Sequence, residues 1–322
     1  MKLRVAQVGI GGMGGGHVNI WSGMEDIEQV AICDIRPEMM DRFDGKITAR
    51  KYTDFDEMLE KETFDILDIT LPTYLHADFA VKALNKGIHV ITEKPISLKK
   101  EDIARIYAAA EKNNKCFMVA HVIRFWPEYM YAKDCMETGR YGKLVSGTMT
   151  RIGTIPQSSW DDWMHDPERS GMVPFDLHIH DLDYLVYALG KPEVEHVFHG
   201  MDYMHAIYKF GDVRIACESA WFHAPVQFRA TFRFQFERAV LEFDGSSMKI
   251  CKSREEGWGV EDMRAGSSVE DGAYIPQSDG YYNELRYFAD CVKENKMPEV
   301  IKPWELEAVM DTIAQINAAK EN

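Results

Sequence analysis

The 322-residue sequence has no long hydrophobic run, no excess of basic residues and no internal repeat. No apolar stretch approaches the roughly 18 residues that cross a bilayer, and glycine interrupts the N-terminal segment before a signal-type apolar region forms. The chain has 37 basic and 52 acidic side chains and a formal net charge of −15. This charge argues against nucleic acid or an anionic membrane as a partner, so we expect a soluble protein that binds neither.

Paired cysteine motifs are also missing. The six cysteines are Cys33, Cys116, Cys135, Cys217, Cys251 and Cys291. They are widely spaced and include no CxxC pair, so they form neither a disulfide framework nor a zinc motif. We expect a reducing, cytoplasmic setting.

The length and composition predict two domains with sizeable cores, since 46% of the residues are hydrophobic and 11% aromatic. In residues 1–121, short β-branched runs alternate with helical patterns. This order indicates βαβ units and a doubly wound parallel sheet of the Rossmann type. The expected strands are residues 3–8, 29–33, 66–70, 89–92 and 116–120, with helices from 13, 37 and 54 and over 74–85 and 99–113.

Residues 122–322 are expected to form a second α/β domain with a largely antiparallel, open sheet. Strand-like alternation occurs in residues 144–152, 194–198, 213–220 and 228–236. In the last of these, apolar residues occupy every second position, which predicts one apolar face. Helices are expected over 281–294 and 304–320, and the last helix is a candidate to pack back on the first domain. Residues 254–279 are expected to form a mobile loop.

A glycine-rich turn follows the first strand directly. Gly9, Gly11 and Gly14 are spaced as GxGxxG between the segment LRVAQV and a helix. In this context the glycines permit a tight turn, close approach of a pyrophosphate and close packing of helix on strand. The expected cofactor-binding loop is Gly9, Ile10, Gly11, Gly12, Met13 and Gly14.

An acidic residue stands at the end of the second predicted strand. Asp34 follows Gly14 by 20 residues, where a carboxylate can accept hydrogen bonds from the adenosine ribose. Its negative charge repels a 2′-phosphate, which favours NAD over NADP as cofactor, although Arg36 weakens that preference. The alternative is a glycine-rich turn with Asp34 as a helix cap.

Several further segments carry a family resemblance. They are GIGGMGGGH (9–17), LPTYLH (71–76), ALNKGIHVITEKP (83–95), RFWPEY (124–129), DLHIHDLD (176–183) and YYNELRYFADCV (281–292). Together they resemble the Gfo/Idh/MocA family of oxidoreductases, which includes glucose-fructose oxidoreductase and inositol dehydrogenase, over nearly the whole chain. The EKP triplet is the most specific of them. The resemblance implies a Rossmann domain followed by a domain whose open sheet commonly forms subunit contacts, so we expect a homodimer or homotetramer.

The resemblance also implies the catalytic residues Lys94, Asp176 and His180 of an NAD(P)-dependent dehydrogenase that acts on a CH–OH group of a sugar, sugar derivative or cyclic polyol such as inositol. Lys94 follows a parallel strand, where residues border the ligand crevice, and Pro95 permits a cis peptide bond. His180 would be the general base, because its ordinary pKa lies near neutrality. Lys94 would stabilise alkoxide character on the same oxygen, and Asp176 would orient the imidazole.

Other residues are assigned by the same resemblance. The residues expected beside the dinucleotide, in addition to the glycine turn and Asp34, are Arg36, Leu71, Pro72, His76, Glu93 and Lys94. The expected substrate-pocket residues are His121, Arg124, Trp126, Trp160 and Trp163, because aromatic faces with polar groups suit sugars. An anionic sugar would require Arg124, Arg151 or Arg169 nearby. Trp160 and Trp163 are equally compatible with an ordinary core or interface position.

One position departs from the commoner family pattern, which has glycine two residues before the catalytic histidine. This chain has His178 there, giving the triplet Asp176, His178 and His180. On an extended segment these side chains share a face and could hold a divalent metal. On a helix His178 points away from the other two. The helical spacing of the apolar residues that follow favours the helix, with His178 turned toward the core, over a metal site.

Two other functions stay open at this point. Some family members use bound NAD for transient oxidation of a sugar so that a glycosidic bond is cleaved by elimination. A few relatives are non-catalytic sugar or dinucleotide sensors. The presence of Lys94, Asp176 and His180 argues against a sensor, because a sensor needs no base.

Overall fold

The structure, a computed structural model, describes residues 2–264 and 280–319, which fall into two compact units. The first unit comprises Met1–His121 and Tyr281–Pro303, and the second comprises Val122–Gly280 and Trp304–Asn322. The chain therefore first leaves the first unit after residue 121 and later returns to it for the segment from 281 to 303. The two domains expected from the sequence, residues 1–121 and 122–322, do not include this return of the chain to the first unit.

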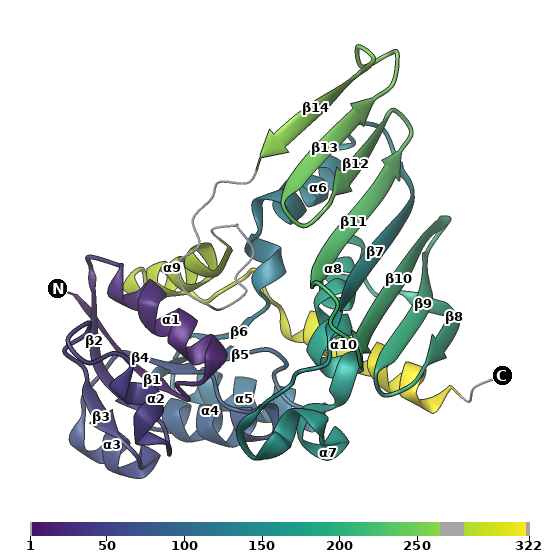
Figure 1. Ribbon diagram of the computed structural model, residues 1–322. Coiled ribbons are helices and arrows are strands. Elements are labelled where there is room, and N and C mark those ends of the chain that lie inside the picture. The colour runs from purple at the N-terminus through teal and green to yellow at the C-terminus, as the bar shows by residue number, and fades with distance from the viewer. Residues whose placement is uncertain (1, 265–279, 320–322) are drawn as a thin grey trace. The chain divides into compact units, whose positions relative to one another are not determined.

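The first unit contains a parallel sheet of six strands in the order β3-β2-β1-β4-β5-β6 (Figure 1). The strands are β1 (Leu3–Val8), β2 (Ile27–Cys33), β3 (Arg50–Tyr52), β4 (Ile66–Ile69), β5 (His89–Glu93) and β6 (Phe117–Ala120). The helices between them are α1 (Gly12–Ser22), α2 (Pro37–Asp41), α3 (Phe55–Lys61), α4 (His76–Asn85) and α5 (Glu101–Lys112). This strand order is that of a doubly wound Rossmann fold, as the alternating pattern predicted.

Burial explains which strands the sequence revealed. All residues of β4 and β6 are buried, because strands in a parallel sheet are covered on both faces and are therefore continuously apolar. The short strand β3 was missed. Its first two residues, Arg50 and Lys51, are exposed, so it lacks the apolar run that marks the others.

The second unit contains eight strands in the order β14-β13-β12-β11-β7-β10-β9-β8. They are β7 (Leu144–Thr154), β8 (Glu193–His199), β9 (Tyr203–Phe210), β10 (Val213–Phe222), β11 (Arg229–Phe236), β12 (Ala239–Phe243), β13 (Ser247–Lys252) and β14 (Gly259–Arg264). Only β7 and β10 pair in parallel; the other neighbours are antiparallel. The predicted open, largely antiparallel sheet is confirmed.

The sequence missed β9, β12, β13 and β14. Strand β14 lies inside the segment that was expected to be a mobile loop, and that expectation is wrong for Gly259–Arg264. This segment is a strand because it pairs antiparallel with β13: Cys251 pairs with Val260 and Lys249 with Asp262. Such pairing cannot be derived from one strand alone. Residues 265–279 of the expected loop lie outside the described residues.

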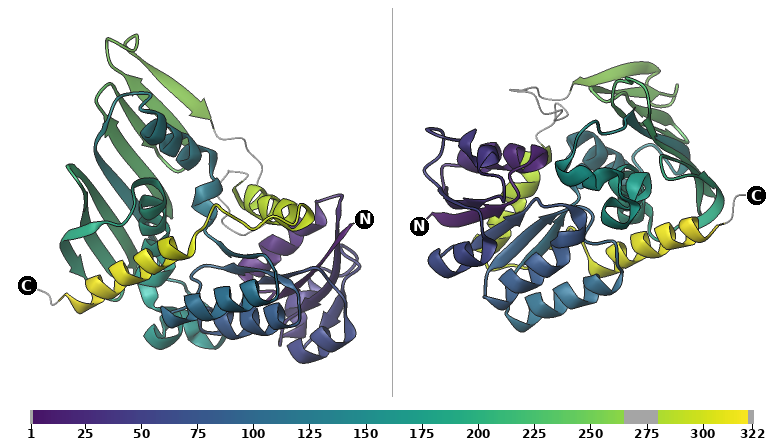
Figure 2. Two further views of the ribbon diagram at one scale, coloured as in Figure 1. Left: turned by 180° about the vertical axis from the view of Figure 1, so that it is seen from behind. Right: turned by 60° about the horizontal axis from the view of Figure 1, so that its bottom comes forward.

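Helices cover one face of the eight-stranded sheet (Figures 1 and 2). These are α6 (Pro127–Thr138), α8 (Ile179–Leu189) and α10 (Pro303–Ala318). Tyr129 of α6 packs edge-on against Phe232 of β11 and Tyr184 of α8, with ring centroids 4.9 Å apart in both pairs. Phe232 and Phe234 are buried whereas Arg233 between them is exposed. The predicted apolar face of this strand is thus the core of the unit.

Of the two C-terminal helices, α9 (Gly280–Lys293) belongs to the first unit. The last helix was the one expected to pack back on the first domain. Leu285, Phe288 and Ala289 of α9 are buried, and Arg286 pairs with Asp26 at 2.8 Å. The last helix, α10, is grouped with the second unit from residue 304 on. Across the described ranges, no helix combines the length and the apolar character needed to cross a membrane.

We expect Phe232→Ala to lower the unfolding free energy of the second unit by about 3–5 kcal/mol, because it leaves a cavity beneath buried aromatic rings. Urea unfolding followed by far-UV circular dichroism measures this loss. The matched control is Arg233→Ala, one residue along the same strand on the exposed face. Equal losses in both variants would contradict the assignment of the core face.

Candidate functional site

The turn between β1 and α1 brings backbone atoms together more closely than a side chain allows. A β-carbon on Gly14 would lie 2.0 Å from the carbonyl oxygen of Gly9. One on Gly9 would lie 2.6 Å from the carbonyl oxygen of Thr70, and Gly9 has a φ of +87°, which glycine adopts most readily. Two glycines of the motif are therefore required by the packing of the turn itself.

The remaining glycines of this turn face open space. A β-carbon on Gly12 would meet nothing within 4 Å, and one on Gly11 would meet only the Arg36 guanidinium at 3.9 Å. Gly11 caps α1 without a side-chain hydrogen bond, and the first turn of α1 has no acidic residue. An uncovered helix N-terminus attracts phosphate groups. The residues present thus fit the pyrophosphate of the NAD that the motif implies.

Asp34 is buried and holds this turn in place. One of its carboxylate oxygens accepts the backbone N–H of Ile10 at 2.7 Å, and the other accepts the backbone N–H of Arg36 at 2.9 Å. A carboxylate oxygen has two lone pairs, so the oxygen that accepts the Ile10 N–H keeps a position for a ribose hydroxyl. The other oxygen is also approached by the Arg36 side chain. The expected ribose contact stays a prediction, whereas the support of the loop is observed.

Two arginines lie at the same turn. Arg36 approaches the Asp34 carboxylate with its Nε at 3.4 Å. Arg42 donates from Nη2 to the carbonyl oxygens of Ile10 at 2.5 Å and Gly11 at 3.2 Å. Sequence reasoning missed Arg42, since it lies after the short helix α2 and outside every motif.

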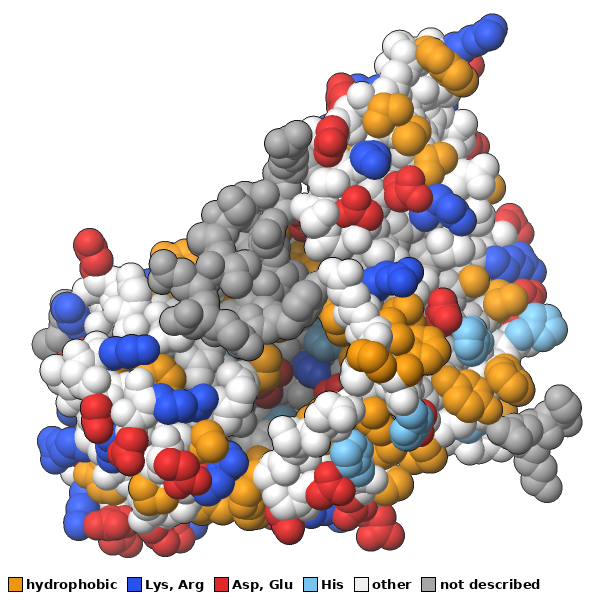
Figure 3. Space-filling model, viewed as in Figure 1, with side chains coloured by type: hydrophobic (Ala, Val, Ile, Leu, Met, Phe, Trp, Pro, Cys, Tyr) orange, Lys and Arg blue, Asp and Glu red, His pale blue; other side chains and the backbone are white. Residues whose placement is uncertain are grey.

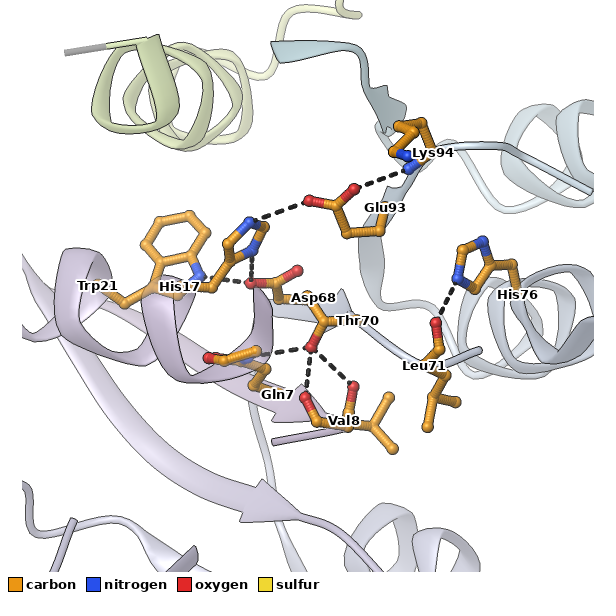
Figure 4. A network of polar contacts seen from close by, with 12 residues as sticks. Gln7, Val8, His17, Trp21, Asp68, Thr70, Leu71, His76, Glu93 and Lys94 are labelled. Carbon is orange, nitrogen blue, oxygen red and sulfur yellow. Dashed lines mark hydrogen bonds and ion pairs between the residues drawn. The ribbon is translucent and has the colours of Figure 1, made fainter. Parts of the chain in front are cut away.

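A buried polar network connects α1 with the ends of β4 and β5 (Figure 4). The Nδ1 atom of His17 lies 2.9 Å from Oδ2 of Asp68, and its Nε2 lies 3.3 Å from Oε1 of Glu93. Trp21 donates its indole N–H to the same Asp68 oxygen at 2.8 Å. Figure 4 shows His17 between the two carboxylates, with Glu93 next to Lys94.

Lys94 is half-buried, in a turn that its neighbours fix. Its backbone N–H donates to Oε2 of Glu93 at 3.1 Å, and the Lys94–Pro95 peptide bond is cis. The ring nitrogens of His76, the first residue of α4, lie 2.7 Å from the carbonyl oxygens of Pro95 and Leu71. The structure thus brings together the residues expected after β4 and β5, namely Leu71, Pro72, His76, Glu93 and Lys94.

In the second unit, Asp176 and His180 flank a buried segment. A π-helical turn, Pro174–His178, leads directly into α8. Asp176 and His180 are partly exposed, whereas residues 177–179 between them are buried. The sequence predicted an ordinary helix here; π turns are rare and occur frequently at functional sites.

His178 turns into the core, as the helical interpretation predicted. Its Nε2 lies 2.5 Å from the hydroxyl of Tyr208 on β9, and its Nδ1 lies 3.1 Å from the hydroxyl of Ser219 on β10. Burial, together with the charge of Arg151, lowers the pKa of His178 to about 3. A metal held with Asp176 and His180 would require His178 to leave one of these bonds, and the described residues contain no group of three or more metal-ligating side chains.

Two arginines that the sequence placed near a substrate are buried in the second unit. Arg124 is 2% exposed and donates two hydrogen bonds to Asp183, at 2.7 and 2.8 Å, and one to Glu305 at 2.6 Å. Arg151 pairs with the buried Asp181 at 2.8 Å. The structure removes Arg124 from the candidate substrate residues, because its guanidinium binds carboxylates inside the core.

The other expected pocket residues differ in exposure. Trp126 is 2% exposed and packs on Tyr129 at 5.7 Å, so it is also a core residue and not a pocket wall. Trp160 and Trp163 are half-exposed, in a 3-10 helical segment, Trp160–His165. His121 is buried at the end of β6 in the first unit. Among the five expected pocket residues, Trp160 and Trp163 are the ones whose aromatic rings are partly exposed.

Comparison with known families agrees with this arrangement. Residues 3–121 match the family model described as the oxidoreductase family with an NAD-binding Rossmann fold, and residues 129–242 match the Gfo/Idh/MocA C-terminal domain. The chain belongs to the Gfo/Idh/MocA family, and its first domain is the NAD-binding Rossmann domain of that family.

Individual relatives are more distant. The chain is 29% identical over 207 residues to a 2,7-anhydro-N-acetylneuraminate hydratase of Mediterraneibacter gnavus, covering 64% of this chain and 54% of the relative. It is 26% identical over 199 residues to an inositol 2-dehydrogenase of Salmonella paratyphi B, covering 59% and 56%. The matches thus span about half the length of these relatives.

A solved structure shares the fold. A levoglucosan dehydrogenase in complex with NADH and levoglucosan superposes with a TM-score of 0.84 at 18% identity, covering 99% of this chain and 98% of that one.

The neutral His178 makes the second unit sensitive to acid. An unfolded histidine titrates near pH 6.5, so below that pH the unfolded chain binds a proton that the folded chain, with a pKa of about 3, does not bind. Stability therefore falls as the pH drops from 6.5 toward 3, by about 2 kcal/mol between pH 7 and pH 5. Urea unfolding at both values checks this; in His178→Gln this component is absent, and equal pH dependence in both proteins would contradict it.

Proposed function

We propose that the protein is an NAD-dependent dehydrogenase that oxidises a hydroxyl carbon of a sugar or cyclic polyol such as inositol. The observation that carries this proposal is Lys94, half-buried at the carboxyl end of β5 in a turn fixed by Glu93 and His76. Ligands of doubly wound sheets bind beyond the carboxyl ends of the strands. Family membership and the names of the relatives support the activity.

The proposed chemistry divides the work among three side chains. His180 accepts the proton of the substrate hydroxyl, because its ordinary pKa lies near neutral pH. Lys94 donates a hydrogen bond to the same oxygen and stabilises its developing negative charge. Asp176, one helical turn before His180, orients the imidazole. Bound NAD supplies the acceptor for the hydride that leaves the carbon.

The preferred cofactor is NAD rather than NADP. The buried Asp34 carboxylate disfavours a 2′-phosphate at the adenosine ribose. Arg36 and Arg42 lie at the same turn, but Arg36 faces the Asp34 carboxylate and Arg42 donates to backbone carbonyls. Both guanidinium groups therefore already have partners that a 2′-phosphate would have to replace.

A second candidate function is a reaction in which NAD is reduced and reoxidised in each turnover, as in the cleavage or hydration of a glycoside. The name of the hydratase relative favours it. It uses the same first step, so it predicts product formation without net accumulation of NADH. A sensor would bind NAD and sugar without forming any product.

We expect Lys94→Ala and His180→Ala each to lower the rate of NADH formation by at least about 10²-fold, because each removes a group acting on the reacting oxygen. The dissociation constant for NAD should stay within about threefold of wild type, well below the 1.4 kcal/mol of a tenfold change. A panel of inositols, aldoses and glycosides with NAD and with NADP, read at the nicotinamide absorbance band, first identifies the substrate.

Matched controls are Lys99→Ala and His196→Ala, which alter an exposed lysine and an exposed histidine. Full turnover in Lys94→Ala would exclude the proposed role of Lys94. Turnover with NADP alone would contradict the role given to Asp34. Product without NADH accumulation would select the second candidate function.

We place the protein in a reducing compartment, the cytoplasm. All six cysteines lie in the described part of the chain, and each is a free thiol. Burial raises the pKa of Cys33 to about 12 and that of Cys116 to about 11. Such thiols are poor nucleophiles and behave as core residues.

We also propose that the protein self-associates through the part of the second sheet formed by β7, β10, β9 and β8, on the face that the helices do not cover. This face carries Phe198, which is 58% exposed, and the partly exposed Ile207 and Thr150. Figure 3 shows hydrophobic and histidine side chains over this part of the sheet. Apolar side chains gathered on one solvated sheet face are typical of an association surface, whereas a single exposed aromatic residue is not.

We expect native mass spectrometry to give two or four times the chain mass of 37.0 kDa. Phe198→Glu should shift the protein toward the monomer, because it places a charge in an apolar contact. Met297→Glu, at a 45% exposed methionine of the first unit, is the control. A wild-type monomer would exclude this surface.

A further inference from the structure

His17 joins parts of the first unit that the topology of the sheet separates. It lies in the second turn of α1, the helix whose N-terminus carries the glycine turn. From β1 the chain runs outward through β2 and β3, while β4, β5 and β6 extend on the other side of β1. His17 contacts Asp68 of β4 and Glu93 of β5. It therefore bridges the point at which the strand order reverses, where dinucleotides bind in this fold.

The geometry of these contacts favours a proton on each ring nitrogen. A neutral imidazole has one N–H and one lone pair, so one of its nitrogens would direct a lone pair at a carboxylate oxygen. Both His17 nitrogens face carboxylates, at 2.9 Å and 3.3 Å. An ionised carboxylate only accepts hydrogen bonds, and Asp68 Oδ2 accepts the Trp21 N–H as well. Nδ1 makes a hydrogen bond with Asp68 and Nε2 a longer ion-pair contact with Glu93, and two carboxylates at these positions favour an imidazolium over a neutral ring.

The surroundings of His17 support this charge. Asp68 is fully buried and Glu93 is 8% exposed, and two buried carboxylates without a cation would be very costly. Although burial opposes protonation, Asp68 and Glu93 raise the pKa of His17 well above its ordinary value. Burial likewise opposes ionisation of Glu93, but His17 and Lys94 lower its pKa.

Other side chains contact the buried group of His17, Asp68 and Glu93. Tyr281 of α9 contacts the His17 ring edge-on with centroids 6.3 Å apart. The charge of Lys94 acts on Glu93 and lowers its pKa, whereas burial lowers the pKa of the neighbouring His76. Glu93 is the link to the candidate catalytic residue, because its second oxygen accepts the backbone N–H of Lys94.

We propose that His17 is a positioning residue whose imidazolium fixes the glycine turn of α1 and the Glu93–Lys94–Pro95 turn relative to each other. Loss of this charge leaves the buried Asp68 and Glu93 without the cation they share, so Glu93 moves and Lys94 moves with it. The same loss releases α1 from β4 and β5 and loosens the dinucleotide cradle. The link to catalysis rests on the proposed function of Lys94, whereas the link to dinucleotide binding does not.

The first experiment observes the proton directly in the wild-type protein. Nitrogen-15 NMR of histidine-labelled protein, with His17 assigned from the missing signal of His17→Gln, should show two protonated ring nitrogens from pH 6 to pH 8. A single protonated nitrogen in this range would overturn the proposal. This measurement needs neither substrate nor turnover.

The second experiment measures what the charge does. We expect His17→Gln to raise the NAD dissociation constant about tenfold and to lower kcat about 10²-fold, with little change in the substrate KM, because Lys94 is displaced from the reacting oxygen. His89→Gln is the matched control, since His89 is a buried histidine at the start of β5, and burial lowers its pKa to about 4. It should leave both values near wild type.

The double variant His17→Gln with Glu93→Gln separates positioning from general loss of stability. Because it removes the carboxylate of Glu93, one of the two that lose their cation and the one linked to Lys94, its kcat and NAD affinity should be no lower than those of His17→Gln alone. Strictly additive losses, or wild-type kcat and NAD affinity in a folded His17→Gln protein, would overturn the proposal. If Lys94→Ala retains turnover, the proposed function fails, yet the NMR signal and the NAD dissociation constant still test the coupling of α1 to the strands.

Discussion

The first unit depends on the contact between Gly14 and Gly9, where a β-carbon would lie 2.0 Å from a carbonyl oxygen. This contact lets α1 start directly on the end of β1, so its uncovered amide groups point beyond the carboxyl ends of the strands. It also sets the depth of α1, and with it the place of His17 one turn further on. Asp34 and Gln7 add hydrogen bonds to the same turn, at 2.7 Å each. A single steric requirement thus fixes both the phosphate cradle and the buried ion group.

Both units hold their candidate catalytic side chains in the same physical way. A residue close in sequence to each candidate catalytic side chain is buried and hydrogen-bonded in the core. For Lys94 this residue is Glu93, and for Asp176 and His180 it is His178, which lies between them in the sequence. Glu93 faces His17, while His178 bonds to two hydroxyl groups on neighbouring strands. Buried polar groups must be satisfied, so each such anchor has few alternative positions. The backbone of the partly exposed residues Lys94, Asp176 and His180 is therefore held in place as well. A site that orients a substrate hydroxyl requires side chains on such a fixed backbone.

The sequence revealed the features that depend on local pattern and missed those that depend on pairing. The Rossmann strands were found because burial on both faces makes them continuously apolar, and the glycine turn because its spacing has a steric cause. Strands β12 to β14 and the π-helical turn escaped, since their form is decided by neighbours distant in the sequence. Arg124 was misplaced for the same reason. Its motif resembles that of the family, but its partners Asp183 and Glu305 lie 59 and 181 residues away.

The positions of the arginines also bear on the class of substrate. Three arginines were candidates to bind an anionic sugar, and the core of the second unit contains two of them, Arg124 and Arg151, paired with carboxylates. The third, Arg169, pairs with Asp161 at 3.1 Å. A substrate carboxylate that bound Arg124 or Arg151 would have to break a buried pair, which costs several kcal/mol, whereas the Arg169–Asp161 pair is partly exposed and is worth little. Of the three arginines, Arg169 is therefore the one whose guanidinium an anionic group could reach at little cost, while Arg124 and Arg151 are committed to the core of the second unit.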